Sequence, residues 1–142
     1  MSRIAFVLII TALCFSGCSK MPVYPEASYN GAGVKIPLNE LDENKPVFFT
    51  FHDGKNKINY FVVKTGGSYQ AYFDACAKCY RRKNGYRLDG SRVICRTCDV
   101  KYSVNDLKEG IGSCYPIKLE GRVEGNVYVI DKEAVLAGVK YF

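Results

Sequence analysis

The chain has 142 residues, enough for one domain with a substantial hydrophobic core. Apolar residues make up 48% and aromatic residues 13% of the chain, which excludes a disordered or collagen-like protein. The formal net charge of +6 would suit nucleic acid, an anionic surface or an acidic protein as a partner. Because the chain begins with an export signal, we expect no nucleic-acid partner.

That signal occupies residues 1–17. An apolar run from Ile4 to Cys14 follows a single arginine; it is too short to span a bilayer as a helix and fits a secretory signal. The next four residues, Phe15-Ser16-Gly17-Cys18, resemble the lipobox of bacterial lipoproteins. The resemblance implies cleavage before Cys18 and a lipid on its sulfur; an ordinary signal peptide cut nearby is the alternative. We therefore expect a bacterial envelope protein, anchored to the lipid bilayer through Cys18 on the periplasmic or extracellular side.

Residues 18–33 contain prolines, glycines and few apolar side chains, and this composition predicts a flexible tether. The alternative is an ordered arm that lies on the domain. The folded domain is expected to span residues 34–142.

β-Strand signals dominate that domain. Aromatic and β-branched runs separated by turn residues predict a meander, a short hairpin and two later strands. These segments are Val47–Phe51, Ile58–Lys64, Ser68–Phe73, a hairpin at 86–94, and strands at 117–119 and 127–130. One helix is expected between Asp131, a capping residue, and Gly138. The fold class is therefore mainly β, a small antiparallel domain with two Cys-bearing loops and a short C-terminal helix.

Four cysteines in these loops follow the pattern C-x2-C-x15-C-x2-C: Cys76, Cys79, Cys95 and Cys98. A two-residue gap lets two thiolates from one tight loop bind one ion, and two such loops supply a tetrahedral set. Thiolates are soft donors that suit zinc or an iron–sulfur centre and do not suit calcium or magnesium. Since each pair follows a predicted strand, the loops can meet at one end of the domain. The pattern predicts one four-thiolate metal site.

Other interpretations of the cysteines stay open. An exported chain meets oxidising conditions, so the pairs could form structural disulfides. A reversible C-x-x-C disulfide would make the protein a thiol oxidoreductase, although that motif usually begins a helix and no helical pattern follows Cys76. Cys114 is either a fifth ligand candidate or a buried free thiol.

Positive charge surrounds the paired cysteines, with seven cations and one acid between Lys78 and Arg96. This charge would lower the pKa values of the thiols, offset a four-thiolate centre and attract an acidic partner. The alternative is a solvated basic loop. The one histidine, His52, has no partner motif near it, so we expect no catalytic residues.

The cysteine region resembles a Rieske domain over about residues 47–131. The resemblance implies a Rieske-like arrangement of the Cys loops. Cys79 and Cys98 stand where that family has histidines, which excludes a strict Rieske centre.

A closer resemblance is to the FtrD-like family of membrane-associated iron–sulfur proteins, linked to bacterial ferrous-iron uptake. The segments that carry it are Val34–Leu38, Phe48–Phe51, Phe73–Cys76, Cys79–Tyr80, Gly85–Arg87, Val93–Cys98 and Gly112–Pro116. The resemblance implies an iron–sulfur centre on the paired cysteines and electron transfer at the membrane. It also implies a membrane redox or iron-permease complex as the partner.

Export bears on which metal is bound. The general export route passes unfolded chains, and this signal lacks the paired arginines of the folded-protein route, so an iron–sulfur cluster would have to be assembled outside. Zinc is the alternative, since a chain can acquire it after export. We expect an electron carrier with an iron–sulfur centre. The alternatives are a structural zinc-binding or disulfide-stabilised module of a membrane complex, and an exported thiol oxidoreductase.

Overall fold

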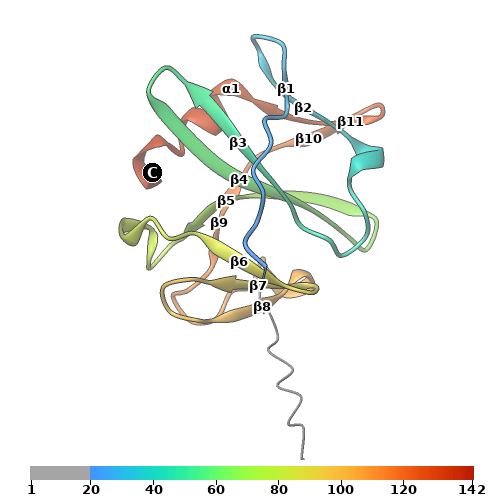
Figure 1. Cartoon of the computed structure of the whole chain (residues 1–142). Coiled ribbons are helices and arrows are strands. Elements are labelled where there is room, and N and C mark those ends of the chain that lie inside the picture. Colours follow the sequence, from blue (N-terminus) through green and yellow to red (C-terminus); the bar gives the residue numbers. More distant parts are fainter. Residues whose placement is uncertain (1–19) are drawn as a thin grey trace, which may run out of the picture.

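Eleven strands in three sheets dominate residues 20–142, the part of the chain that the computed structural model describes (Figure 1). The predicted export signal and the lipidation site Cys18 lie outside these residues. The strands are β1 Ser28–Tyr29, β2 Gly33–Pro37, β3 Val47–Asp53, β4 Asn56–Thr65, β5 Ser68–Cys76, β6 Tyr86–Asp89, β7 Arg92–Cys95, β8 Lys101–Ser103, β9 Pro116–Leu119, β10 Arg122–Glu124 and β11 Val127–Asp131. The pairings between them are all antiparallel.

Helical structure is short. The α-helix α1 spans Lys132–Leu136 and follows Asp131, as the capping pattern predicted. Four 3-10 turns complete the described elements: η1 Leu38–Glu40, η2 Tyr80–Arg82, η3 Val104–Asp106 and η4 Val139–Tyr141. The predicted fold class, a mainly β antiparallel domain with a short C-terminal helix, is confirmed. Among the described residues, no helix is both long and apolar enough to cross a membrane.

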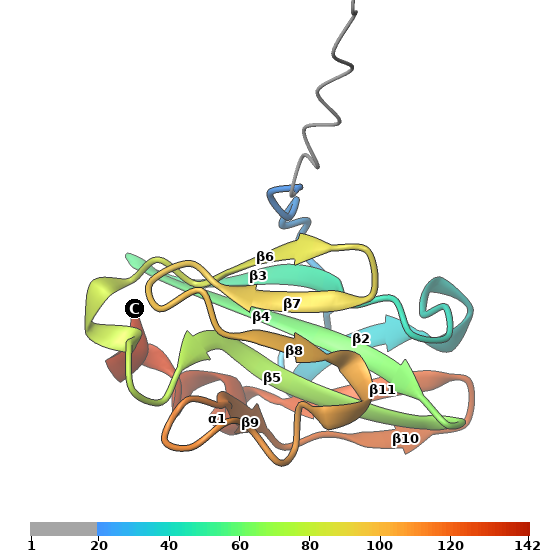
Figure 2. The ribbon, with the colours of Figure 1, turned by 90° about the horizontal axis from the view of Figure 1, so that it is seen from below.

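The sheets form layers, with the sheet β3-β4-β5-β9 in the middle (Figures 1 and 2). The sheet β1-β2-β11-β10 and α1 lie on one side of it, and the sheet β6-β7-β8 lies on the other. Side chains alternate between the faces of a strand, so the apolar runs of the middle strands supply both sides. On β4, Ile58 and Tyr60 face one side, whereas Phe61 and Val63 face the other.

Two hydrophobic cores result, one on each face of the middle sheet. The first core contains Val34, Ile36, Leu41, Phe49, Phe51, Ile58, Tyr60, Val62, Ala71, Phe73, Ala75, Leu119, Tyr128, Ile130 and Val135. The second core contains Phe48, Phe61, Val63, Tyr72, Cys76, Tyr86, Val93, Cys95, Tyr102, Val104, Leu107 and Cys114. Three of the predicted site cysteines therefore belong to the second core.

Stacked aromatic rings run across the second core. Cross-strand pairing places Phe48 opposite Phe61 and Phe61 opposite Tyr72, with ring centroids 4.9 and 5.4 Å apart. Tyr86 meets Phe61 edge to face at 6.0 Å. Such pairs contribute about 0.5–1.5 kcal/mol each beyond the area they bury. The cysteines thus sit on a rigid aromatic base.

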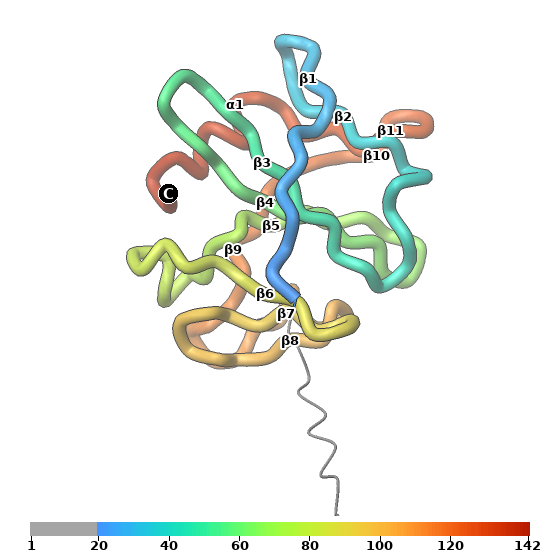
Figure 3. Tube along the Cα trace, viewed as in Figure 1, coloured from blue at the N-terminus to red at the C-terminus, as the bar shows by residue number. Residues whose placement is uncertain are grey.

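Residues 20–33, predicted as a tether, run along the domain (Figure 3). Lys20 and Leu88 exchange two backbone hydrogen bonds of 2.9 and 3.0 Å, and the Thr50 N–H donates to the Pro25 carbonyl at 3.0 Å. The Tyr24 ring packs edge to face on Phe48 at 5.6 Å. These contacts are those of an ordered arm.

Candidate metal centre

Each site cysteine is placed by the end of a strand or by the turn that follows it. Cys76 ends β5 and Cys95 ends β7, and the second cysteine of each pair lies in the next turn. Cys114 lies in the loop before β9, where it forms a short bridge with Ile111. Because β9 pairs with β5 and sets Pro116 opposite Cys76, this loop comes to the same end of the domain.

Backbone hydrogen bonds close both cysteine turns. The Cys79 N–H donates to the Cys76 carbonyl at 3.0 Å, which curls the first pair around one point. In the second turn the Asp99 N–H donates to the Cys95 carbonyl at 2.9 Å, and Asp99 adopts the left-handed backbone region with φ of 56°. Two tight turns therefore present their thiols at fixed positions.

The five cysteines of the described residues gather at this end as free thiols. The sulfurs of Cys76, Cys79, Cys98 and Cys114 all lie within 4.8 Å of one another. The Cys98 and Cys114 sulfurs are 3.7 Å apart. Cys95 lies outside that set of four, although its thiol contacts that of Cys98. The structure thus brings both predicted pairs and Cys114 together, with Cys98 in contact with three other thiols.

Burial differs among the five thiols. Cys76, Cys95 and Cys114 are buried, Cys79 is half-buried, and Cys98 is exposed. Burial raises the pKa of Cys79 far above the usual range for a thiol, and the Cys98 thiol adds to this effect. Burial also raises the pKa of Cys114. The cluster is therefore buried on one side and reaches solvent at Cys98.

Backbone N–H groups point at the sulfurs of the second pair. Burial raises the pKa of Cys95 to about 11, while the N–H groups of Cys98 and Thr97 oppose this rise by donating to its sulfur. Burial likewise favours the neutral form of Cys98, but the Val100 N–H and the neighbouring thiols outweigh it and lower the pKa of Cys98. Donors aimed at sulfur stabilise the thiolate, which is the form that binds a metal.

Two buried tyrosine hydroxyls also fit a charged centre. The Tyr86 and Tyr102 hydroxyls are buried and have no hydrogen-bond partner among the described residues. After burial, the charge of Cys76 is the main reason that the pKa of each tyrosine is raised. A thiolate at Cys76 would give a neighbouring hydroxyl an acceptor, whereas a neutral thiol is a weak one. A set of sulfur ligands surrounded by hydroxyl and N–H hydrogen-bond donors fits a soft metal ion or an iron–sulfur centre.

Sequence reasoning missed Asp74, which ties the first cysteine turn to the rest of the domain. Its carboxylate is buried and accepts hydrogen bonds from the Tyr24 hydroxyl at 2.6 Å and the Tyr86 N–H at 2.7 Å. Burial raises the pKa of Asp74 to about 6, against these hydrogen bonds. Gly85 packs directly against this carboxylate. The sequence signal for this role was an acidic residue within an apolar strand, just before a cysteine pair.

The chain on either side of Cys79 is strongly basic. Lys78, Arg81, Arg82 and Lys83 are exposed, and none of them forms an ion pair within residues 20–142. Lys78 is close enough to lower the pKa of Cys114, against the effect of burial. The other three cations follow on η2 and its cap, where hydrogen bonds from Arg82 and Lys83 fix the turn.

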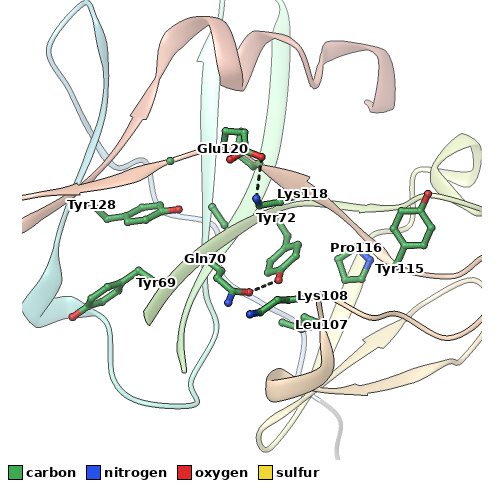
Figure 4. A pocket seen from close by; sticks show the side chains of 13 residues that line it. Tyr69, Gln70, Tyr72, Leu107, Lys108, Tyr115, Pro116, Lys118, Glu120 and Tyr128 are labelled. Atoms are coloured by element: carbon green, nitrogen blue, oxygen red, sulfur yellow. Dashed lines mark hydrogen bonds and ion pairs between the residues drawn. The ribbon is translucent and has the colours of Figure 1, made fainter. Parts of the chain in front are cut away.

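The spaces beside the cluster differ greatly in size. The hollow bordered by Cys76, Cys79 and Cys95 measures about 10 Å3, room for about one water molecule. A groove of about 510 Å3 lies alongside, with Tyr69 and Tyr128 at one end and Tyr115 and Pro116 at the other (Figure 4). None of the five cysteines in the described part of the chain lines the groove. An organic substrate of ordinary size would fit the groove but not the hollow against the thiols.

Comparison with known families points to the same chemistry. A family model described as "Membrane iron-sulfur containing protein FtrD-like" matches residues 41–142, which include all five cysteines of the cluster. No curated protein matches the chain.

Proposed function

This chain belongs to the FtrD-like family of membrane iron–sulfur proteins, and we propose that it is an exported, lipid-anchored electron carrier in ferrous-iron uptake or a membrane redox chain. The observation that supports this most is the convergence of five thiols, from three separate loops, at one solvent-reaching end of a rigid β domain. An iron–sulfur centre bound there would supply a one-electron couple. The cysteine thiolates would hold it, and the tyrosine hydroxyls and backbone N–H groups around them would stabilise its negative charge.

Electron transfer suits this geometry better than catalysis on an organic molecule. The hollow bordered by Cys76, Cys79 and Cys95 is about 10 Å3, which is too small for an organic substrate. Cys98 is exposed while Cys76 and Cys114 are buried. Electrons could therefore enter and leave through one edge of a centre that is otherwise shielded from water.

The partner would be a membrane redox or iron-permease complex that offers an acidic surface. The exposed cations on either side of Cys79 lie next to the site and would attract such a surface. Lipidation at Cys18 would hold the domain at the bilayer and keep it near this complex.

A structural zinc module is the second candidate. The same thiols supply the tetrahedral sulfur set that zinc prefers, and zinc can bind after export. In this case the metal would stabilise the second core, and the exposed cations would serve docking alone.

Metal analysis of the full chain, purified without oxygen from membranes, separates these functions. We expect iron, visible absorption that bleaches on reduction, and an electron paramagnetic signal in one oxidation state. A colourless protein that contains one zinc ion and shows no redox transition would overturn the electron-carrier proposal and support the zinc module. Disulfides in the freshly purified protein would favour the disulfide-stabilised module or the thiol oxidoreductase, and only the oxidoreductase would reduce and re-form them during a thiol-exchange assay.

A further inference from the structure

The separation of the sulfurs distinguishes a single ion from a cluster. Four ligands at the corners of a tetrahedron, each ~2.3 Å from the ion, lie ~3.8 Å from one another. Here the Cys98 and Cys114 sulfurs are 3.7 Å apart, and the set of four stays within 4.8 Å. In a cluster, ligands of different irons are further apart, because an iron–iron spacing is added between them. The sulfurs are therefore spaced for one ion.

The set of four is not the one that the repeated C-x2-C pattern suggests. It contains Cys114 in place of Cys95. Cys114 is held by mutual backbone hydrogen bonds with Ile111, of 2.8 and 3.0 Å. The adjoining Tyr115 carbonyl accepts from the Ala77 N–H at 2.9 Å, which fixes this loop to the first cysteine turn. Backbone hydrogen bonds thus hold Cys114 at the site.

We propose that the centre is a mononuclear iron ion held by Cys76, Cys79, Cys98 and Cys114, with Cys95 outside the ligand set. This inference rests on the proposed function and specifies its cofactor. Cys95 then acts as a positioning residue. It is buried, and its backbone shapes the turn that carries Cys98: its carbonyl accepts from the Asp99 N–H at 2.9 Å and its N–H donates to the Val100 carbonyl at 3.0 Å.

A single ion also resolves the difficulty with export. A chain that crosses the membrane unfolded can bind one ferrous ion on folding, as small metal sites commonly do. No inorganic sulfide and no cluster assembly are needed outside the cytoplasm. The same four thiolates would bind iron in both oxidation states.

Held by the thiolates of Cys76, Cys79, Cys98 and Cys114, iron would supply a ferric–ferrous couple that takes one electron from a reduced one-electron carrier. The four thiolates would stay bound, no proton would be transferred, and the charge of the site would become more negative by one. The cations beside the site, Lys78 above all, would offset that added charge.

Composition and spectroscopy of the anaerobically purified full chain test the inference. We expect one iron per chain, no acid-labile sulfide, and the signal of a high-spin ferric ion in the oxidised form. X-ray absorption should show four sulfur neighbours and no iron–iron scattering. Iron accompanied by equal sulfide would overturn the mononuclear centre and leave the electron-carrier proposal standing. Zinc alone, with no redox-active iron form after ferrous loading, would overturn both.

A matched pair of variants tests the ligand set. Cys114→Ser should weaken iron binding by more than about tenfold, because loss of a ligand's outer partner alone costs about that much. Cys95→Ser should keep one iron per chain with the same ferric spectrum. The opposite result, iron kept by Cys114→Ser and lost by Cys95→Ser, would overturn the assignment. If either variant fails to fold by circular dichroism, sulfur-neighbour counts of the unaltered chain and of Cys79→Ser decide whether a four-sulfur single-iron site exists.

Discussion

The two faces of the middle sheet have different tasks, although the same strands build both. The first core is lined by aliphatic and aromatic side chains and contains no cysteine. The second core contains Cys76, Cys95 and Cys114 together with the buried tyrosines Tyr86 and Tyr102. Neighbouring residues of one strand therefore belong to different cores: Ala75 packs into the first core and Cys76 into the second. One face is thus given to packing alone, while the other combines hydrophobic packing with the thiols of the metal-binding site.

Replacing Cys76 should give the largest effect. Cys76→Ser removes a buried sulfur and leaves a hard oxygen donor, so we expect loss of the metal and destabilisation of the second core by about 3 kcal/mol or more. The measurements are metal content per chain and thermal unfolding. Retention of a full metal complement would contradict the assignment of Cys76 to the site.

Ala75, the residue before Cys76, supplies the control for the Cys76→Ser variant. Ala75→Ser places a hydroxyl in the first core at a position that is 3% exposed, at a cost of about 1–3 kcal/mol. The metal content should stay that of the unaltered chain, since Ala75 faces away from the thiols. Equal metal loss in the two variants would mean that the two faces are not independent.

A larger truncation in the first core also tests whether the two cores are independent. Ile130 is fully buried on β11, and Ile130→Ala should lower the free energy of unfolding by about 2–5 kcal/mol. Metal affinity of the folded protein should change by less than tenfold. Chemical unfolding followed in parallel with metal binding measures both quantities, and a large loss of affinity in the folded variant would show coupling between the cores.

The sequence was most informative where structure is local. Alternating aromatic and β-branched residues predicted β3, β4 and β5, and the capping residue Asp131 predicted the start of α1. The spacing of the paired cysteines likewise predicted two thiol-bearing turns, because two residues are enough to define a tight turn.

Contacts between residues that are far apart in the sequence could not be predicted from it. Cys114 meets Cys98 only because β9 pairs with the distant β5. Tyr24 reaches Asp74 across 50 residues of sequence. Neither contact has a local pattern, since each depends on a sheet register and on packing that form together. The repeated motif therefore drew attention to Cys95, while the spatial set of four includes Cys114.

Two glycines test how much the contact between Gly85 and the buried Asp74 carboxylate stabilises the second core. Gly85 and Gly90 both have positive φ, 65° and 61°. A Cβ on Gly85 would collide with the Asp74 carboxylate, whereas one on Gly90 would meet open space. Gly90→Ala should cost about 1 kcal/mol from backbone strain alone. Gly85→Ala should cost about 2–4 kcal/mol, because the collision and the displaced hydrogen bonds of Asp74 are added. Equal costs in urea unfolding would show that the contact between Gly85 and Asp74 is unimportant.

The smallest expected effect concerns the surface rather than either core. Arg81→Glu with Lys83→Glu reverses two exposed cations beside the site and leaves all thiols in place. If electrons pass at this edge, oxidation of the reduced protein by anionic ferricyanide should slow several-fold at low ionic strength. Oxidation by cationic hexaammineruthenium should become faster. Both changes should shrink near 0.1 M salt, where screening acts within about 10 Å. Stopped-flow absorbance gives the rates.

A distant pair of lysines separates local from overall charge. Lys55→Glu with Lys57→Glu makes the same change in net charge at the turn between β3 and β4 and at the start of β4, where both side chains are exposed. Because a small ion reacts within a few ångströms of the electron's exit point, this control should alter the rates much less than the pair beside Cys79. Equal effects would mean that only net charge matters and that the basic turn is not the docking edge. A larger effect from the distant pair would place electron exchange elsewhere on the domain, away from Cys98.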